Sequence, residues 1–272
     1  MNTEQRQRLE HAIKNGFPLY SAQCMQLGLG IYRSRFRDFA IFALMVPFIG
    51  SFLTIFGLGW VGTIILTVIV SPVLNAGFYL AAHSTVERQP WTFSRFFEAT
   101  PQAMPLIVNN ALGLIISAIV ITPMYFLLER IGFLEWWTEV AANPASPPEP
   151  PGMTSGQSTA FFLNLIPLIY LQVGFSWAFP LILFMGANPF NALENSRRLI
   201  NRAWGAQFWL LFSFFSMFML ASLILSPIAA VSGGLGNILS FGLFLIFPWA
   251  YCSLYVGFHG ALFTKQEDKS ED

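Results

Sequence analysis

The sequence predicts an all-α polytopic integral membrane protein, with six transmembrane helices and amphipathic interfacial helices on the cytoplasmic side. Three observations indicate this fold class. Hydrophobic residues make up 55% of the 272 residues and charged residues only 10%, whereas soluble domains carry about 25% charged residues. Six long apolar runs follow one another along the chain. Basic residues occupy alternate loops between these runs, and this alternation independently supports the number six.

The residues before the first run, 1–37, form a predicted cytoplasmic N-terminal segment that contains an interfacial helix. Within this segment Tyr20, Cys24, Leu27 and Ile31 recur at helical spacing and line one face of a helix. Three arginines follow at the end of this stretch. We expect an amphipathic helix that lies in the membrane interface. The alternative is a solvated segment whose arginines only anchor the first span.

The six predicted spans form one transmembrane domain over residues 38–263. A spanning helix needs about 20 mostly apolar residues, and none of the runs carries a charge at its centre. The first run follows a long polar segment, so we expect it to remain as an anchor and not to be cleaved as a signal peptide. The predicted spans cover residues 38–58, 60–83, 105–128, 159–186, 206–231 and 236–263.

The basic residues predict the orientation of the chain. Of the fourteen Lys and Arg residues, all but Arg130 lie before the first span or after the second, fourth and sixth spans. By the positive-inside rule both termini are cytoplasmic, including a tail at 264–272. The loop at 129–158 then faces outward. Five prolines between residues 143 and 158 predict an extended, polyproline-like connector in this loop.

The loop after the fourth span predicts a short amphipathic helix on the cytoplasmic side. Asn188 and Pro189 are a suitable N-cap and first helical position, and the helix is expected to reach about residue 204. Its basic side is a candidate contact for anionic lipid or a protein partner, although arginines in such a loop also serve simply to fix topology. The candidate contact residues are Arg197, Arg198, Arg202 and Trp204.

Residues suited to catalysis are scarce. The chain has three histidines, and we find no His-Glu-x-x-His motif, nucleophile elbow, phosphate-binding glycine loop or paired intramembrane carboxylates. The sequence therefore predicts no enzyme, no cofactor and no metal site. The one metal arrangement worth weighing joins His83 and His259, near the ends of spans two and six, with Glu87. A net charge of zero shows no nucleic-acid footprint, and Cys24 and Cys252 suggest no disulfide framework.

Polar groups inside the spans are a second candidate site. Asn75, Asn109 and Gln172 lie within apolar runs that also contain several prolines. Amides in this setting line a polar cavity or join helices through hydrogen bonds. We weigh the packing role ahead of a substrate site, and both alternatives stay open.

Four sequence motifs carry a resemblance to a known family. Arg33–Phe36 opens span one, Pro72–Tyr79 lies in span two, Ala192–Ile200 leads toward span five, and Pro248–Cys252 lies in span six. Together they resemble a broad family of uncharacterised six-span bacterial inner-membrane proteins. Related spans resemble the membrane domain attached to some glycerophosphoryl diester phosphodiesterases. The resemblance implies a bacterial cytoplasmic (inner) membrane location, and it implies no catalytic residues.

Three functional hypotheses follow from the sequence. The leading one is a non-enzymatic inner-membrane protein that scaffolds or regulates partners, which are membrane lipids, other membrane proteins or a homo-oligomer, but not nucleic acid. The alternative is a carrier or binding protein for a small apolar or lipid-like molecule, motivated by the charge-free interior. The third is an intramembrane enzyme built on the histidine arrangement above.

Overall fold

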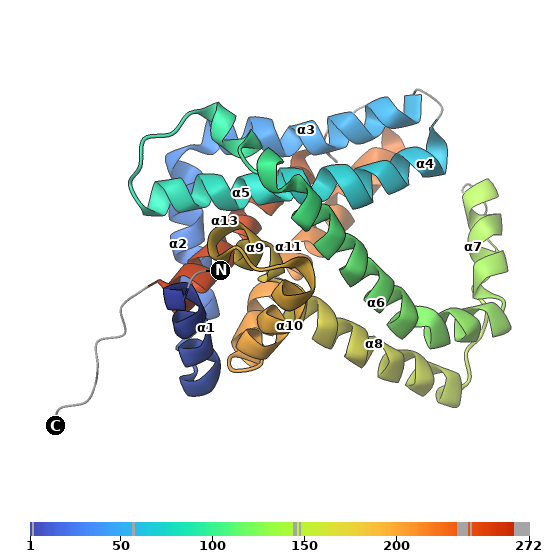
Figure 1. Ribbon diagram of the computed structural model, residues 1–272. Coiled ribbons are helices and arrows are strands. Elements are labelled where there is room, and N and C mark those ends of the chain that lie inside the picture. The colour runs from blue at the N-terminus through green and yellow to red at the C-terminus, as the bar shows by residue number, and fades with distance from the viewer. Residues whose placement is uncertain are drawn as a thin grey trace. The chain divides into compact units, whose positions relative to one another are not determined.

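The computed structural model describes residues 1, 3–55, 58–143, 146, 148–232, 239 and 241–263. Every regular element in these ranges is helical, and the ranges contain no strand (Figure 1). The predicted tail at 264–272 and part of the start of the sixth predicted span lie outside the described residues.

Two helices, α1 (Thr3–Asn15) and α2 (Ser21–Ser34), precede the first apolar segment. The next elements are α3 (Phe36–Ile55), α4 (Gly59–Ile64), the π-helix η1 (Ile65–Val70), α5 (Ser71–Val86), the 3₁₀ segments η2 (Phe93–Phe97) and η3 (Thr100–Gln102), and α6 (Ala103–Arg130). They are followed by α7 (Phe133–Ala142), α8 (Ser155–Phe175), α9 (Ala178–Met185), α10 (Pro189–Ile200), α11 (Trp204–Val231), the 3₁₀ segment η4 (Leu243–Leu245) and α13 (Ile246–Leu262).

Six segments of the described chain are long and apolar enough to cross a membrane, which confirms the predicted fold class. They are Phe36–Leu53, Gly59–Val86, Phe93–Arg130, Ser155–Met185, Trp204–Pro227 and Leu243–Leu262. Much of their apolar surface is not covered by the rest of the chain. In the third segment, for example, only 6% of the most apolar 18-residue stretch is buried. Apolar side chains left uncovered in this way are suited to contact with lipid.

The chain divides into two compact units, Met1–Ala111 with Val173–Asp272, and Leu112–Gln172. In the first unit α2 packs along α13, α5 packs against η2 and α13, and α1 lies beside α10 (Figure 1). The second unit holds α7 with parts of α6 and α8. There the Trp136 indole donates a hydrogen bond to the Pro148 carbonyl at 2.9 Å, so Pro148 lies against α7.

Aromatic side chains fix α3, α5 and η2 to one another in the first unit. Phe42 stacks on Phe96 with ring centroids 4.2 Å apart and meets Phe78 edge-on at 5.0 Å. All three rings are buried. A Cβ at Gly77 of α5 would lie 2.2 Å from the Phe96 carbonyl oxygen, so glycine is required for this close approach. Aromatic pairs of this kind contribute about 0.5–1.5 kcal/mol beyond their buried area.

The fourth apolar segment is broken, although the sequence predicted one continuous span at 159–186. α8 ends at Phe175 and α9 begins at Ala178. Pro180 explains the break, because proline has no N–H to donate and its ring clashes with the carbonyl four residues earlier. That carbonyl belongs to Ser176, the first residue of the break.

Side chains from α10 and α11 form hydrogen bonds with residues at this break. The Ser196 hydroxyl accepts a hydrogen bond from the Trp177 N–H at 3.1 Å and donates one to the Gly174 carbonyl at 2.6 Å. The Gln207 amide donates to the Ser176 hydroxyl at 2.8 Å. Ser196 and Gln207 are fully buried. Backbone groups freed by a broken helix need such partners, so this contact ties α10 and α11 to the fourth segment.

The helix predicted after residue 188 is present but shorter than expected. The Asn188 side chain accepts a hydrogen bond from the Asn191 N–H at 2.8 Å and caps α10, with Pro189 at its first position. α10 was predicted to reach about residue 204. It ends at Ile200, where the following turn tightens because the Ala203 N–H bonds back to the Ile200 carbonyl at 2.8 Å. α11 then begins at Trp204.

Candidate functional site: an apolar groove and a charged cleft

The contact between α2 and α13 is unusually close. A Cβ on Gly28 of α2 would lie 2.6 Å from the Ser253 backbone nitrogen and 2.7 Å from its Cα. The Trp249 indole of α13 also donates a hydrogen bond to the Met25 carbonyl at 2.8 Å. The buried face of α2 consists of Cys24, Gly28 and Tyr32. Only glycine at position 28 allows the two backbones to approach this far.

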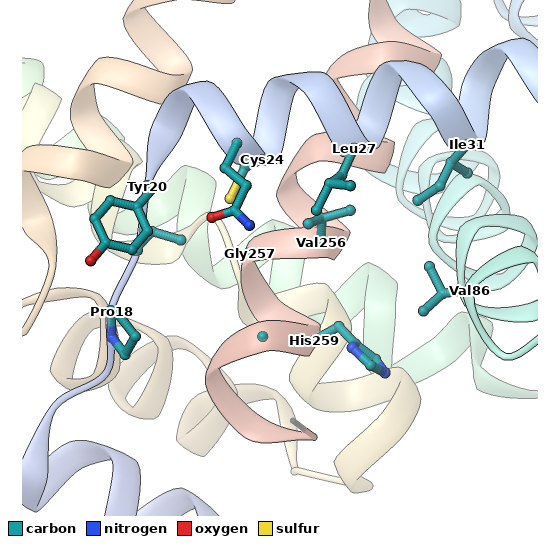
Figure 2. A pocket seen from close by; sticks show the side chains of 12 residues that line it. Pro18, Tyr20, Cys24, Leu27, Ile31, Val86, Val256, Gly257 and His259 are labelled. Atoms are coloured by element: carbon teal, nitrogen blue, oxygen red, sulfur yellow. The ribbon is translucent and has the colours of Figure 1, made fainter. Parts of the chain in front are cut away.

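The predicted apolar face of α2 therefore packs on protein fully only at Cys24. Of its four members only Cys24 is buried, whereas Tyr20 is 66% and Leu27 50% exposed. These residues border a groove of about 370 Å³ between α2 and α13. Figure 2 shows Tyr20, Cys24, Leu27 and Ile31 along α2, across from Val256 and Gly257 of α13. Val86, the last residue of α5, lies below Ile31 at the right of the view (Figure 2).

One ionisable residue of the groove is paired with a carboxylate that does not line it. His259 lines the groove, and its Nε2 lies 3.0 Å from Oε1 of Glu87. His83 is engaged elsewhere, because its Nδ1 lies 2.6 Å from the Tyr255 hydroxyl. The metal hypothesis joined His83, His259 and Glu87, but the described residues hold no group of three ligands placed to bind a metal ion. The structure brings only His259 and Glu87 into direct contact.

Cys24 is the one thiol that borders the groove. Its side chain is buried, and desolvation raises the pKa of the thiol from 9.0 to about 11. A Cβ on Gly257 would lie 3.6 Å from the Cys24 sulfur and 3.2 Å from the Trp177 ring. The thiol therefore stays protonated near neutral pH and acts as part of the apolar wall.

A second hollow, of about 650 Å³, lies between α1 and α10. α1 is firmly held beside it, because Leu9 and Ala12 are buried and the Gln5 amide donates a hydrogen bond to the Phe184 carbonyl at 3.0 Å. The Arg202 guanidinium donates to the Ile13 carbonyl at 2.5 Å. We call this hollow the α1–α10 cleft. Its charged lining residues are Arg6, Glu10, Lys14, Glu194, Arg198 and Arg202.

The structure separates the four contact residues predicted from the sequence. Arg198 and Arg202 line the α1–α10 cleft, whereas Arg197 and Trp204 do not. Arg197 instead donates two hydrogen bonds to Glu194, at 2.9 and 2.7 Å. These bonds lower the pKa of the Glu194 carboxyl below its ordinary value. Trp204 stacks on Phe208 with ring centroids 5.2 Å apart.

The three amides predicted to line a cavity have separate environments. Asn109 is 2% exposed and its amide donates to the Pro189 carbonyl at 2.7 Å, at the start of α10. Gln172 donates to the Ser117 hydroxyl at 3.0 Å within the second unit. Asn75 is half-buried on α5. None of the three borders the groove or the cleft.

Sequence reasoning missed Arg6 and Lys14 as members of a charged hollow. A signal was available, since Leu9 and Ala12 lie three residues apart and form a short apolar stripe that α1 buries. The stripe indicates that α1 docks on something, but not that its partner is α10. No family model, curated protein or solved structure matches the chain.

Proposed function

We propose that this protein is a non-enzymatic membrane protein that binds a lipid-like amphiphile in the groove between α2 and α13. One observation carries the proposal. Tyr20, just before α2, and Leu27 of α2 are at least half exposed, and they border a hollow of about 370 Å³. Ligand sites in proteins are commonly mostly apolar hollows of about 300–1,000 Å³ with a few polar groups.

The groove offers contacts for both parts of an amphiphile. Leu27 and Ile31 of α2 and Val86 of α5 offer aliphatic contacts for an acyl chain. His259, which lines the groove and lies 3.0 Å from the Glu87 carboxylate, offers a hydrogen-bonding group for a polar head. Because lipid tails are as apolar as the groove itself, moving an acyl chain from the bilayer into it gains little hydrophobic free energy. Selectivity then depends on the shape of the groove and on the polar pair.

We also propose a bacterial inner-membrane location with both termini cytoplasmic, and membership of the six-span family that the sequence motifs resemble. The distribution of Lys and Arg supports this orientation. In this orientation the groove lies at the cytoplasmic ends of the second and sixth apolar segments. The scaffolding role that the sequence placed first stays a prediction. We favour amphiphile binding because the groove is a specific structural feature that a scaffold does not require.

The proposal is tested with a photoreactive fatty acid that carries a diazirine in its chain. The full chain is reconstituted in nanodiscs, irradiated and digested, and labelled peptides are identified by mass spectrometry. We expect labelling of α2 around Leu27 and of α13 around Val256, and competition by excess unlabelled fatty acid. Labelling that is spread over all six apolar segments and is not competed would reflect bulk lipid and refute the proposal.

A matched pair of glycine variants shows whether the groove itself is responsible. Gly260 lines the groove, and a Cβ there meets no atom within 4 Å, so Gly260→Trp adds a large side chain at the groove without a clash at Cβ. A Cβ on Gly30 of α2 is equally unhindered, but Gly30 does not line the groove. We expect Gly260→Trp to abolish competed labelling and Gly30→Trp to retain it. Equal labelling of the two variants would contradict the proposal.

A further inference from the structure

The α1–α10 cleft is a second hollow, separate from the groove, and the proposed amphiphile binding does not involve it. Its walls are ordered by contacts far apart in sequence, including the bond from Arg202 to the Ile13 carbonyl. Leu9 of α1 is only 2% exposed, and Arg6 and Lys14 of the same helix line the cleft. At about 650 Å³ the cleft is larger than the groove.

The charges of the cleft favour an anion. Four basic side chains line it against two carboxylates, Glu10 and Glu194. Glu10 is paired with Arg6 at 2.9 Å. Glu194 is paired at 2.7 Å with Arg197, which is not a lining residue, so a charge from outside the cleft compensates this carboxylate. The cleft therefore keeps an excess of positive charge.

Two basic groups in the cleft remain available. Lys14 and Arg198 form no ion pair with any residue that the structure describes. Asn191 and Asn195 add side-chain amides to the same lining. A guanidinium binds phosphate oxygens in pairs, while an ammonium acts as a compact charge, so Arg198 with Lys14 is a suitable combination for a phosphate group.

We propose that the α1–α10 cleft binds a phosphate-bearing anion, either the phosphorylated headgroup of a lipid or a free phosphate compound. A phosphate group concentrates its charge on one centre, which basic residues from two helices can surround. An acidic protein segment presents a row of carboxylates and would bring some of them beside Glu10 and Glu194, where like charges repel. The cleft thus fits a single compact anion better than an acidic peptide.

The full chain is tested in nanodiscs, because α1 precedes the first apolar segment whereas α10 lies between the fourth and fifth. Binding of inorganic phosphate and pyrophosphate is measured by calorimetry in nanodiscs of phosphatidylcholine alone. Retention of phosphatidic acid from mixed nanodiscs is measured by native mass spectrometry. Binding of the free anions indicates a soluble phosphate compound, and retention of phosphatidic acid alone indicates a lipid headgroup. Either result supports the proposal.

Variants locate the binding in the cleft. The double variant Lys14→Gln with Arg198→Gln removes both available charges, and we expect the Kd to rise about tenfold or more, equivalent to about 1.4 kcal/mol. The control, Arg33→Gln with Arg37→Gln, removes two exposed arginines that do not line the cleft. Both proteins are checked for wild-type helicity and elution. Arg198→Lys keeps the charge but loses the paired bonds, so its Kd is expected to lie between those of the wild type and the double variant.

Three outcomes would overturn the proposal. The first is a wild-type protein that binds neither the free anions nor phosphatidic acid. The second is a double variant whose affinity equals that of the arginine control, which would assign the effect to net charge. The third is tighter binding of a polyglutamate peptide than of phosphate in either form. The groove variants leave Lys14 and Arg198 intact, so loss of amphiphile binding and loss of anion binding are separate results.

Discussion

Replacing Gly28 with alanine tests whether the α2–α13 contact stabilises the protein. The added Cβ would lie 2.6 Å from the Ser253 nitrogen and 2.7 Å from its Cα, whereas ordinary contacts begin at 3.4 Å. The Ser253 hydroxyl can rotate away, but its backbone cannot. Since 3.4 Å exceeds 2.6 Å by 0.8 Å, the two helices must separate by nearly that distance.

The expected cost follows from general packing energetics. Forcing an extra methyl into a well-packed contact costs about 1–3 kcal/mol. Alanine also has a higher helix propensity than glycine, which stabilises the folded protein by about 0.5–1 kcal/mol. Gly30 lies on the same helix and a Cβ there meets nothing within 4 Å, so Gly30→Ala receives the gain without the clash. The difference between the two variants isolates the packing cost of about 1–3 kcal/mol.

The assay is thermal unfolding of both variants in one detergent, followed by loss of circular dichroism or of monodisperse elution. A difference of 1 kcal/mol corresponds to about 2–4 °C in Tm for a chain of this size class. We expect Gly28→Ala to unfold below Gly30→Ala by at least that much. If Gly28→Ala is as stable as Gly30→Ala, the close approach does not exist and the reasoning fails.

Three further predictions follow. Ser196→Ala leaves two buried backbone groups at the α8–α9 break without partners and should lower stability by about 1–3 kcal/mol, whereas Ser213→Ala, which removes a hydroxyl bonded within its own helix, should be near neutral in the same thermal assay. Cys24 should react slowly with maleimide at neutral pH because it is buried with a pKa of about 11, and Leu27→Cys, at a 50% exposed position of the groove, should react rapidly. The pKa of Glu194 is lowered by its bonds to arginine, so its stabilising contribution is present above the ordinary carboxyl pKa of 4.5 and is lost as pH falls through the lower folded value. A Tm difference between wild type and Glu194→Gln that persists in strong acid would contradict this assignment.

The fold class could be predicted from the sequence because lipid imposes simple rules. A run of about 20 apolar residues without a central charge has few soluble alternatives, and all six predicted spans correspond to described apolar segments. The N-terminal cap of α10 could also be predicted, because Asn188 and Pro189 occupy the expected positions. Pro180 accounts for the break at Ser176, four residues earlier. Several other prolines, however, lie inside continuous helices. Proline alone therefore does not identify a break.

The candidate site was predicted only in part, because it depends on contacts between distant segments. The spacing of Tyr20, Leu27 and Ile31 identified an apolar helix face, yet the residue that decides the orientation of α2 is Gly28, whose partner Ser253 lies near the other end of the chain. Similarly, the arginines after residue 196 were visible as a basic group. Which of them remain available depends on pairing geometry that sequence spacing does not specify.

The π-helix η1 joins α4 to α5 without a break, and the Asn110 amide donates to the Thr67 carbonyl within it at 3.0 Å. A π turn holds about one residue more than an α turn. Deleting one residue between positions 65 and 70 would convert this stretch into regular α-helix and leave α5 in nearly the same rotational setting. Deleting a residue within α5 ahead of Gly77 would instead rotate that glycine by about 100° away from the Phe96 carbonyl. The second apolar segment thus contains one short interval in which evolution can shorten the chain while the aromatic cluster on α5 keeps its alignment.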